Sequence, residues 1–172
     1  MVRIILLLCL FSTSTFAKEF KQVKIAATRL SPAAKKIEQQ AWWVYTYAQK
    51  YNIDPYIMLA LIKVESNFDQ AAVSDTGDYS LAQINYAVWN KELESKGMKL
   101  DYDKLQKNSS YAIEKMAIIL SLIKKRHAKK DPHWYGRYHS NTKKYKKRYL
   151  KKVNHYLSKI NTPNSRSIAQ DN

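Results

Sequence analysis

Residues 54–66 read Asp54-Pro55-Tyr56-Ile57-Met58-Leu59-Ala60-Leu61-Ile62-Lys63-Val64-Glu65-Ser66. Asp followed by Pro is an N-cap and first-turn pair with which helices begin, so this stretch is predicted to be a helix. At about 100° per residue, Glu65 falls between Leu61 and Ile62 on the apolar stripe of that helix. A carboxylate is unexpected at such a position.

Two interpretations of Glu65 follow from this placement. It is either a surface residue that closes the helix, or a carboxyl group held against apolar neighbours. In the second case the lost hydration raises the pKa, and the group can carry a proton near neutral pH as a general acid must. Perturbed carboxylates suggest function without proving it, so the segments around Glu65 have to decide.

The amino-terminal segment is predicted to be a secretory signal peptide over residues 1–17. Arg3 supplies the positive start, residues 4–11 form a short apolar run, and Thr15-Phe16-Ala17 is a small-x-small cleavage site. The run is too short for a resident transmembrane helix, so no stable membrane insertion is expected. The alternatives are an uncleaved anchor or a buried core segment. Export would place the protein in the periplasm.

Cys9 is the only cysteine of the chain and lies inside the predicted signal. Leu8 precedes it where a lipoprotein signal would have a small residue, which disfavours lipidation. The exported chain would therefore contain no intramolecular disulfide and no thiolate site.

Composition favours one all-α domain with a basic surface. Removal of the signal leaves roughly 155 residues, which suits a single core. Three glycines and four prolines are few for a fold with many β-turns. The net charge of +16 suits an acidic polymer, whether nucleic acid, an anionic membrane surface or a cell wall bearing carboxylates. Charge alone does not choose among these.

The periodicity of apolar residues predicts further helices on both sides of residues 54–66. One begins at Ser31-Pro32 and runs to about Asn52, a short one covers 86–96, a third is capped by Ser109 or Ser110, and the last runs from about 142 to 160. Residues 67–78 are expected to be a polar loop. The predicted organisation is a signal at 1–17, a lead-in at 18–34, the domain at 35–160 and a polar disordered tail at 161–172.

Three segments, in this order, carry a family resemblance. They are Ala60-Leu61-Ile62-Lys63-Val64-Glu65-Ser66-Asn67-Phe68, then Gly77-Asp78-Tyr79-Ser80-Leu81-Ala82-Gln83-Ile84-Asn85, then Gly136-Arg137-Tyr138-His139-Ser140. Behind a predicted signal peptide, this order resembles the catalytic domain of soluble lytic transglycosylases, over roughly residues 35–155. The resemblance implies a single lysozyme-like all-α domain that cleaves peptidoglycan.

The first two segments supply expected site residues. The resemblance makes Glu65 the catalytic acid and base, and places Ser66 beside it. The family's Gly-Leu-Met-Gln block corresponds to Ser80-Leu81-Ala82-Gln83, so Gln83 should line the cleft and hydrogen-bond a sugar. Ser80 stands where the family usually has glycine, and is included with Ser66 and Gln83 among the expected substrate-binding residues.

The third segment is expected to complete the cleft. The family's Ala-Tyr-Asn-Ala-Gly block appears here as Arg137-Tyr138-His139-Ser140-Asn141. In the family, the hydroxyl at the position of Tyr138 orients the catalytic carboxyl group. His139 replaces asparagine, as in small members that serve envelope-spanning secretion or conjugation machines, so such an apparatus is a candidate partner. Trp134 is the tryptophan expected to stack on a sugar ring.

The chemistry implied by the resemblance uses one carboxyl group. Glycosidases normally use two, and no second acid stands out, because the loop residues Asp69, Asp75 and Asp78 are of a kind that more often forms turns. Glu65 would protonate the bond between N-acetylmuramic acid and N-acetylglucosamine, then take the O6 proton as a 1,6-anhydro ring closes. No cofactor is expected, and no metal site, because the four histidines lack ligand spacing.

Two alternatives stay open. A hydrolytic muramidase on the same fold would leave reducing ends in place of anhydro ends. A non-enzymatic basic binding module is suggested by residues 143–152, where lysines alternate with tyrosines that could stack on bases. We favour a solvated cationic helix face drawn to acidic muropeptides or anionic lipids. Peptidoglycan strands are therefore the expected partner, and nucleic acid is not.

Overall fold

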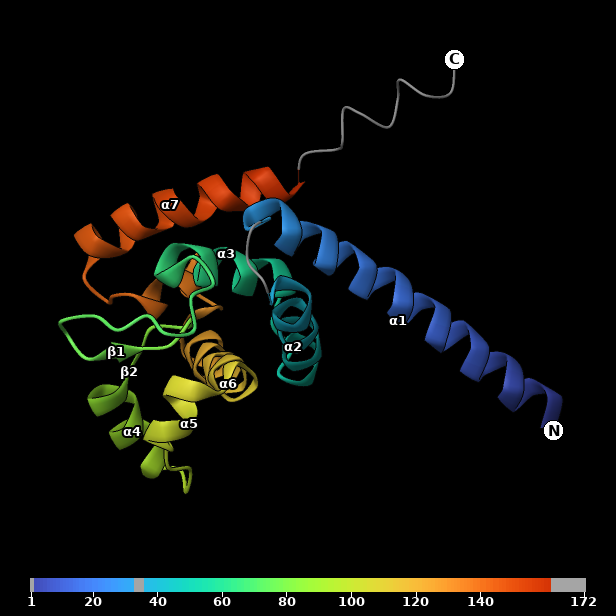
Figure 1. Cartoon of the computed structure of the whole chain (residues 1–172), viewed down its shortest axis with the longest axis horizontal. Coiled ribbons are helices and arrows are strands. Elements are labelled where there is room, and N and C mark those ends of the chain that lie inside the picture. The colour runs from blue at the N-terminus through green and yellow to red at the C-terminus, as the bar shows by residue number, and fades with distance from the viewer. Residues whose placement is uncertain (1, 33–35, 162–172) are drawn as a thin grey trace, which may run out of the picture.

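The computed structural model of the protein describes residues 2–32 and 36–161, and it is almost entirely helical (Figure 1). This confirms the all-α prediction. The described elements, in chain order, are α1 (Val2–Leu30), α2 (Ile37–Lys50), α3 (Pro55–Ser66), β1 (Asp78–Tyr79), β2 (Ile84–Asn85), α4 (Tyr86–Glu94), α5 (Tyr102–Lys107), α6 (Ser109–His127), the 3-10 helix η1 (Trp134–Tyr138) and α7 (Lys143–Asn161).

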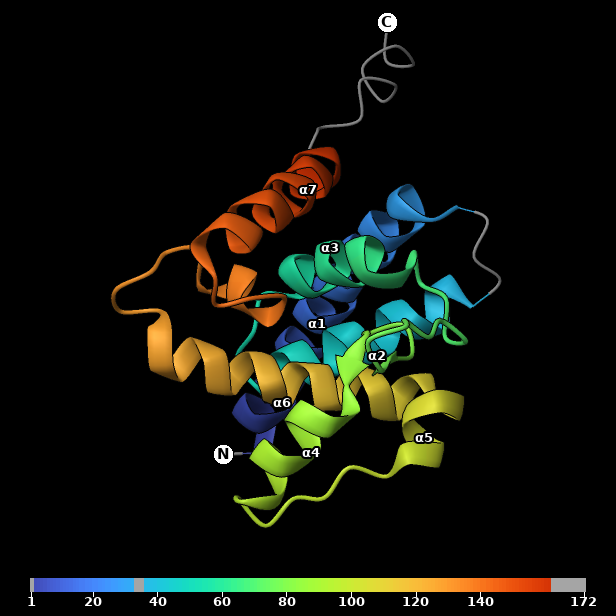
Figure 2. The ribbon, with the colours of Figure 1, turned by 90° about the vertical axis from the view of Figure 1, so that its left-hand side faces the viewer.

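Helix α3 lies at the centre of the fold, as its apolar sequence predicts. The Asp54 side chain accepts a hydrogen bond from the Tyr56 N–H at 2.7 Å, and Pro55 occupies the first turn, so the predicted start is confirmed. Residues 58–62 have no exposed surface. Helices α1, α2 and α7 pack against α3, and α6 lies on the side of α3 opposite to α7 (Figures 1 and 2).

Helix α6 is the second buried helix, and its cap differs from the predicted one. The Asn108 side chain accepts a hydrogen bond from the Tyr111 N–H at 3.0 Å, so the cap is Asn108 and the helix begins at Ser109. Both asparagine and serine can cap a helix, and the choice depends on which residue has an extended backbone. Here Asn108 ends α5, whose presence the sequence did not predict.

Helix α2 begins later than predicted, at Ile37. The Ser31-Pro32 pair ends the preceding helix instead of starting the next one: the Ser31 N–H bonds to the Ala27 carbonyl at 3.0 Å and Ser31 is buried. Proline has no N–H to continue a helix, so a helix can stop before it as well as start with it.

The lead-in is the second half of a long helix. Residues 18–30 belong to α1, and this half packs against α2, α3 and α7, while the amino-terminal half projects from the body (Figure 1). Val23, Ala26, Ala27 and Leu30 are at most 4% exposed and form part of the hydrophobic core. Among the described residues, no helix is long and apolar enough to cross a membrane. The predicted tail lies outside the described residues apart from Asn161.

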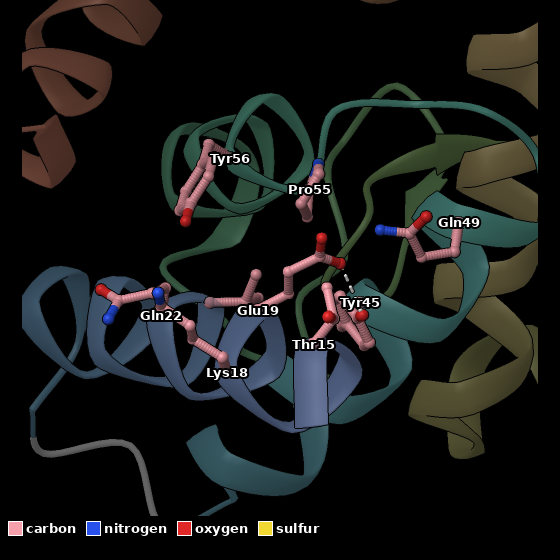
Figure 3. A pocket seen from close by; sticks show the side chains of 9 residues that line it. Thr15, Lys18, Glu19, Gln22, Tyr45, Gln49, Pro55 and Tyr56 are labelled. Carbon is pink, nitrogen blue, oxygen red and sulfur yellow. Dashed lines mark hydrogen bonds between the residues drawn. The ribbon is translucent and has the colours of Figure 1, made fainter. Parts of the chain in front are cut away.

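Glu19 fastens α1 to α2. The Tyr45 hydroxyl donates a hydrogen bond to the Glu19 carboxylate at 2.9 Å. Burial, together with this negative charge, raises the pKa of Tyr45 to about 12. A hollow of about 560 Å³ lies beside this bond, bordered by α1, α2 and the start of α3 at Pro55 (Figure 3). Phe16 also contacts the Tyr45 ring edge-on, with centroids 4.9 Å apart.

A truncation series tests this role of α1. A chain that begins at Lys18 should keep a cooperative thermal transition, because it retains Glu19 and the four buried side chains. A chain that begins at Ser31 should lose it, since burial of Val23 and Leu30 contributes about 1.5–3 kcal/mol each against a total stability of about 5–15 kcal/mol. Circular dichroism melting measures both. Equally cooperative melting of the two chains would show that α1 is dispensable to the core.

Candidate active site

A short hairpin begins at Asp78, the last residue of the segment that was predicted to be a polar loop. Strand β1 pairs antiparallel with β2, with Asp78 opposite Asn85 and Tyr79 opposite Ile84. The turn between them needs a left-handed backbone, with φ of 70° at Ser80 and 45° at Gln83. Glycine adopts such a conformation without strain, which explains physically why the family usually has glycine where Ser80 stands.

Gln83 holds this hairpin from within. Its amide nitrogen donates to the carbonyl oxygens of Ala72 and Ser80, both at 3.0 Å. The side chain also lines the neighbouring cleft. Because the amide nitrogen is engaged with the loop, the amide oxygen is the group that Gln83 can present to a sugar hydroxyl.

The hairpin forms one wall of a cleft of about 400 Å³. The three sequence segments meet there, because Glu65 comes from α3, Gln83 from the hairpin, and Tyr138 and His139 from η1 and its end. Other residues that line the cleft are Thr76, Asp78, Asn85, Val88, Trp89, Arg137, Ser140 and Asn141. The lining is mostly polar around a single glutamate.

The surroundings of Glu65 keep its carboxyl group close to half protonated at neutral pH. Its pKa is raised from 4.5 to about 7, mainly by burial and in smaller part by the negative charge of Asp78. A hydrogen bond from Tyr149 and the positive charge of Lys152 act in the opposite direction. Desolvation is the largest of these effects, as the position of Glu65 on the apolar stripe indicates.

Tyr149 is the residue that orients Glu65. Its hydroxyl donates a hydrogen bond to Glu65 Oε1 at 2.5 Å. The His139 ring stacks on the Tyr149 ring, with centroids 4.7 Å apart and planes 10° apart. The resemblance assigned this orienting role to Tyr138. In the structure the Tyr138 hydroxyl donates instead to the Ala82 carbonyl at 2.7 Å, which ties η1 to the hairpin turn.

Comparison with protein families identifies the fold that holds this cleft. The family model described as the transglycosylase SLT domain matches residues 43–136, which include Glu65 and Gln83. The chain belongs to the transglycosylase SLT domain family. Curated protein sequences yield no significant match.

Membership confirms the resemblance and the lysozyme-like, mainly α fold. It supports a glycan-cleaving activity of the transglycosylase type, with peptidoglycan of the cell envelope as the substrate class. The matched residues end at Gly136, so Tyr138, His139 and Tyr149 of this SLT domain are placed by the structure and not by the family match.

Three expected binding residues of the SLT domain do not line the cleft. Ser80 is 1% exposed, and its hydroxyl accepts from the Ala82 N–H at 3.3 Å. The Ser66 hydroxyl donates to the Leu81 carbonyl at 2.8 Å, so it joins α3 to the hairpin turn. Trp134 is 8% exposed and packs edge-on against Tyr135. The tryptophan that lines the cleft is Trp89.

Asp78 is a second carboxylate in the cleft. Its Oδ2 accepts hydrogen bonds from the hydroxyls of Ser74 and Thr76, both at 2.7 Å. By contrast, Asp69 accepts from the Ala71 N–H at 2.9 Å and acts as a turn former. Within residues 2–32 and 36–161, no three His, Cys, Asp or Glu side chains come together in a way that could hold a metal ion.

The contact of Tyr149 with Glu65 could not be predicted from the sequence, because Tyr149 belongs to the apolar face of its helix. It lies on this face together with Val153, and both side chains are buried. A buried tyrosine hydroxyl almost always has a hydrogen-bond partner. That expectation was the available signal, but the partner lies 84 residues away in the sequence.

Tyr149→Phe should raise the pKa of Glu65, because the hydroxyl stabilises the carboxylate form and its removal favours the proton. The measurement is an NMR titration of the glutamate carboxyl carbons. Tyr145→Phe is the matched control, since Tyr145 is 52% exposed on the same helix and should leave the titration unchanged. A midpoint that stays in place or falls in the Tyr149 variant would contradict the assigned hydrogen bond.

Glu65→Gln should stabilise the fold at pH 8 and have little effect near pH 4. Between the ordinary pKa of 4.5 and the native value of about 7, the folded state binds the proton more tightly than the unfolded state. Stability therefore falls as pH rises through this window, and the Gln variant escapes a loss on the order of 3 kcal/mol. Urea unfolding at the two pH values measures the difference.

Glu114→Gln serves as the opposite control. Burial raises the pKa of Glu114, but hydrogen bonds from Lys50 and Tyr51 outweigh it and lower the pKa overall. This charged glutamate supports the fold above its ordinary pKa, so its variant should lose stability at pH 8. If both variants changed stability in the same direction, the buried-acid description of Glu65 would be wrong.

Proposed function

We propose that the protein is a peptidoglycan lytic transglycosylase. It cleaves the β-1,4 bond between N-acetylmuramic acid and N-acetylglucosamine and leaves a 1,6-anhydro end. The observation that carries the proposal is the Glu65 carboxyl group, which lines a polar cleft with a pKa of about 7 and a hydrogen bond from Tyr149. Such a group can give a proton and take one back at the same pH.

In the proposed reaction Glu65 acts first as an acid. Its proton passes to the glycosidic oxygen as the bond from the muramic acid C1 breaks, and the substrate's acetamido group assists. The resulting carboxylate then removes the proton from O6, and O6 bonds to C1 to close the anhydro ring. Glu65 ends protonated as it began, and no water is consumed. Tyr149 holds the carboxylate through the intermediate stage.

The other cleft residues are proposed to bind the strand. The Gln83 oxygen accepts from a sugar hydroxyl, His139 contacts the substrate while its ring is held by Tyr149, and Trp89 offers a ring face to a sugar. Tyr138 shapes the cleft through its bond to Ala82. Burial lowers the pKa of His139, so it is a neutral hydrogen-bonding group near pH 7.

A hydrolytic muramidase is the second candidate, and Asp78 is the observation that favours it. A second carboxylate in a cleft can activate water in a hydrolase. In our proposal Asp78 has a different role: its charge raises the pKa of Glu65 while two hydroxyls hold it in place.

The proposal extends to location and organisation. Residues 1–17 act as a cleaved signal, the domain covers residues 35–160 together with the packed part of α1, and the protein works in the periplasm. On the basis of His139, the protein is proposed to act for an envelope-spanning secretion or conjugation apparatus. It would open the wall locally while that apparatus is assembled.

Digestion of purified sacculi tests the reaction. The parent protein should release anhydro-ended muropeptides, and Glu65→Gln should lose about 10²–10⁴-fold in rate, the usual contribution of a general acid. Glu94→Gln, which removes an exposed carboxylate of α4 outside the cleft, should match the parent. Chromatography with mass analysis identifies the products.

Each contrary outcome has a separate meaning. Products with reducing ends would assign hydrolysis and a role for Asp78. A Glu65→Gln protein that still dissolves sacculi would sink the enzymatic assignment.

A further inference from the structure

A second hollow lies between α3 and α7, close to the cleft but distinct from it. Its volume is about 480 Å³, and it is lined by Lys63, Val64, Lys151, Lys152, His155 and Tyr156. Helices α3 and α7 run side by side at this place (Figures 1 and 2). The sequence predicts a solvated face for the lysines of α7, whereas in the structure Lys151 and Lys152 line a concave site.

The hollow carries positive charge without compensation. Three ammonium groups line it, and no carboxylate does among the described residues. Residues 143–161 contain no Asp or Glu. In the described part of the chain, Lys63, Lys151 and Lys152 have no ion-pair partner, and the hydrogen bond of Lys63 goes to the neutral Asn67 side chain.

Tyr156 fixes part of this charge in place. The Lys63 ammonium lies 5.7 Å from the centroid of the Tyr156 ring, and the Lys159 ammonium lies 5.5 Å from it. Cations over an aromatic face are attracted to it and lose some of their freedom. Burial and the charge of Lys159 lower the pKa of Lys63, as expected where like charges are gathered. An incoming anion would relieve that repulsion.

Lys152 connects the hollow to the catalytic carboxyl group. It lines the hollow, and its charge also lowers the pKa values of Glu65 and His139. Lys152 follows Tyr149 by three residues, which is about one helical turn. Lys63 and Val64 directly precede Glu65 on α3. Lys152 thus borders the hollow and lies within electrostatic range of Glu65, so we expect a substituent of a strand bound in the cleft to extend toward the hollow.

We propose that this hollow binds carboxylate groups of the peptide stem carried by the muramic acid residue of the bound strand. The inference rests on the proposed function, and it identifies the part of the substrate that the hollow would bind. Peptide stems carry free carboxylates within a few residues of their attachment to the glycan. Lysine ammonium groups form charge-assisted hydrogen bonds with carboxylates and tolerate variation in their direction.

An anionic membrane is the less suitable occupant. Helices that bind a membrane surface insert apolar side chains beside their cations. Among the described residues of α7, Tyr145 is the exposed large apolar side chain, and it does not line the hollow. Tyr149, Val153 and Ile160 of the same helix are buried against the body.

The first test compares two glycan substrates. One is strands with intact peptide stems, and the other is the same strands after an amidase has removed the stems. Lys63→Gln combined with Lys151→Gln should lower kcat/KM about tenfold on strands with stems, and less than twofold on stripped strands. The ratio of the two values cancels any general effect on the site.

A matched control has the same change of charge elsewhere. Lys129→Gln combined with Lys130→Gln removes two exposed lysines that follow α6 and do not line the hollow. This control should keep the ratio of the parent protein. An equal ratio in all three proteins would overturn the inference.

The second test measures binding without catalysis, in the Glu65→Gln protein. N-acetylmuramyl-L-alanyl-D-glutamate should bind in calorimetry, its amidated form should bind about tenfold more weakly, and the Lys63/Lys151 substitutions should abolish that difference. If the parent protein cleaves neither strand type, the proposed function fails. The binding test still shows whether the hollow binds carboxylates of the peptide stem. Loss of binding to phosphatidylglycerol vesicles, with no change for the muramyl peptide, would assign the lysines to lipid and overturn the inference.

Discussion

The desolvation of one carboxyl group governs this structure. Helix α3 is buried over residues 58–62, and Glu65 lies near its end, where the core meets the cleft. The same burial that gives α3 its central place makes the charged form of Glu65 unfavourable. A more hydrated glutamate would leave the cleft with an ordinary carboxylate and no proton to give at neutral pH. The residues around Glu65 therefore adjust the pKa from both directions, Asp78 upward and Tyr149 and Lys152 downward.

The side chains of the three family segments mainly hold neighbouring elements together through hydrogen bonds to backbone carbonyls. Ser66 bonds to the carbonyl of Leu81, Tyr138 to that of Ala82, and Gln83 to that of Ala72. The tight turn at residues 80–83 leaves the carbonyls of Leu81 and Ala82 without a strand partner, and Ser66 and Tyr138 satisfy them, while Gln83 ties the turn to the preceding loop. Residues that appear from the sequence to be substrate contacts thus set the position of the hairpin. The cleft has its shape because of them.

The sequence predicted the parts of the fold that depend on local chemistry. The Asp54 cap, the buried run of α3 and the long helices α6 and α7 follow from periodicity and capping within a short stretch. Features that depend on distant contacts were missed. The two-residue strands are too short to show alternation, α1 packs through small alanines that resemble a linker, and Tyr149 shares a stripe with Val153. For the site, Glu65 and Gln83 were placed in the cleft, whereas Ser80 and Trp134 became buried through packing that no local pattern specifies.

The continuous course of α1 bears on the proposed removal of the signal peptide. If residues 1–17 are removed as proposed, the helix starts at Lys18 and Glu19 falls within its first turn. Carboxylates near a helix amino terminus are stabilised by the macrodipole. Glu19 would then gain a second favourable partner besides Tyr45, and the free α-amino group would stand next to it. Processing would thus turn a mid-helix glutamate into the terminal anchor of the helix that completes the core.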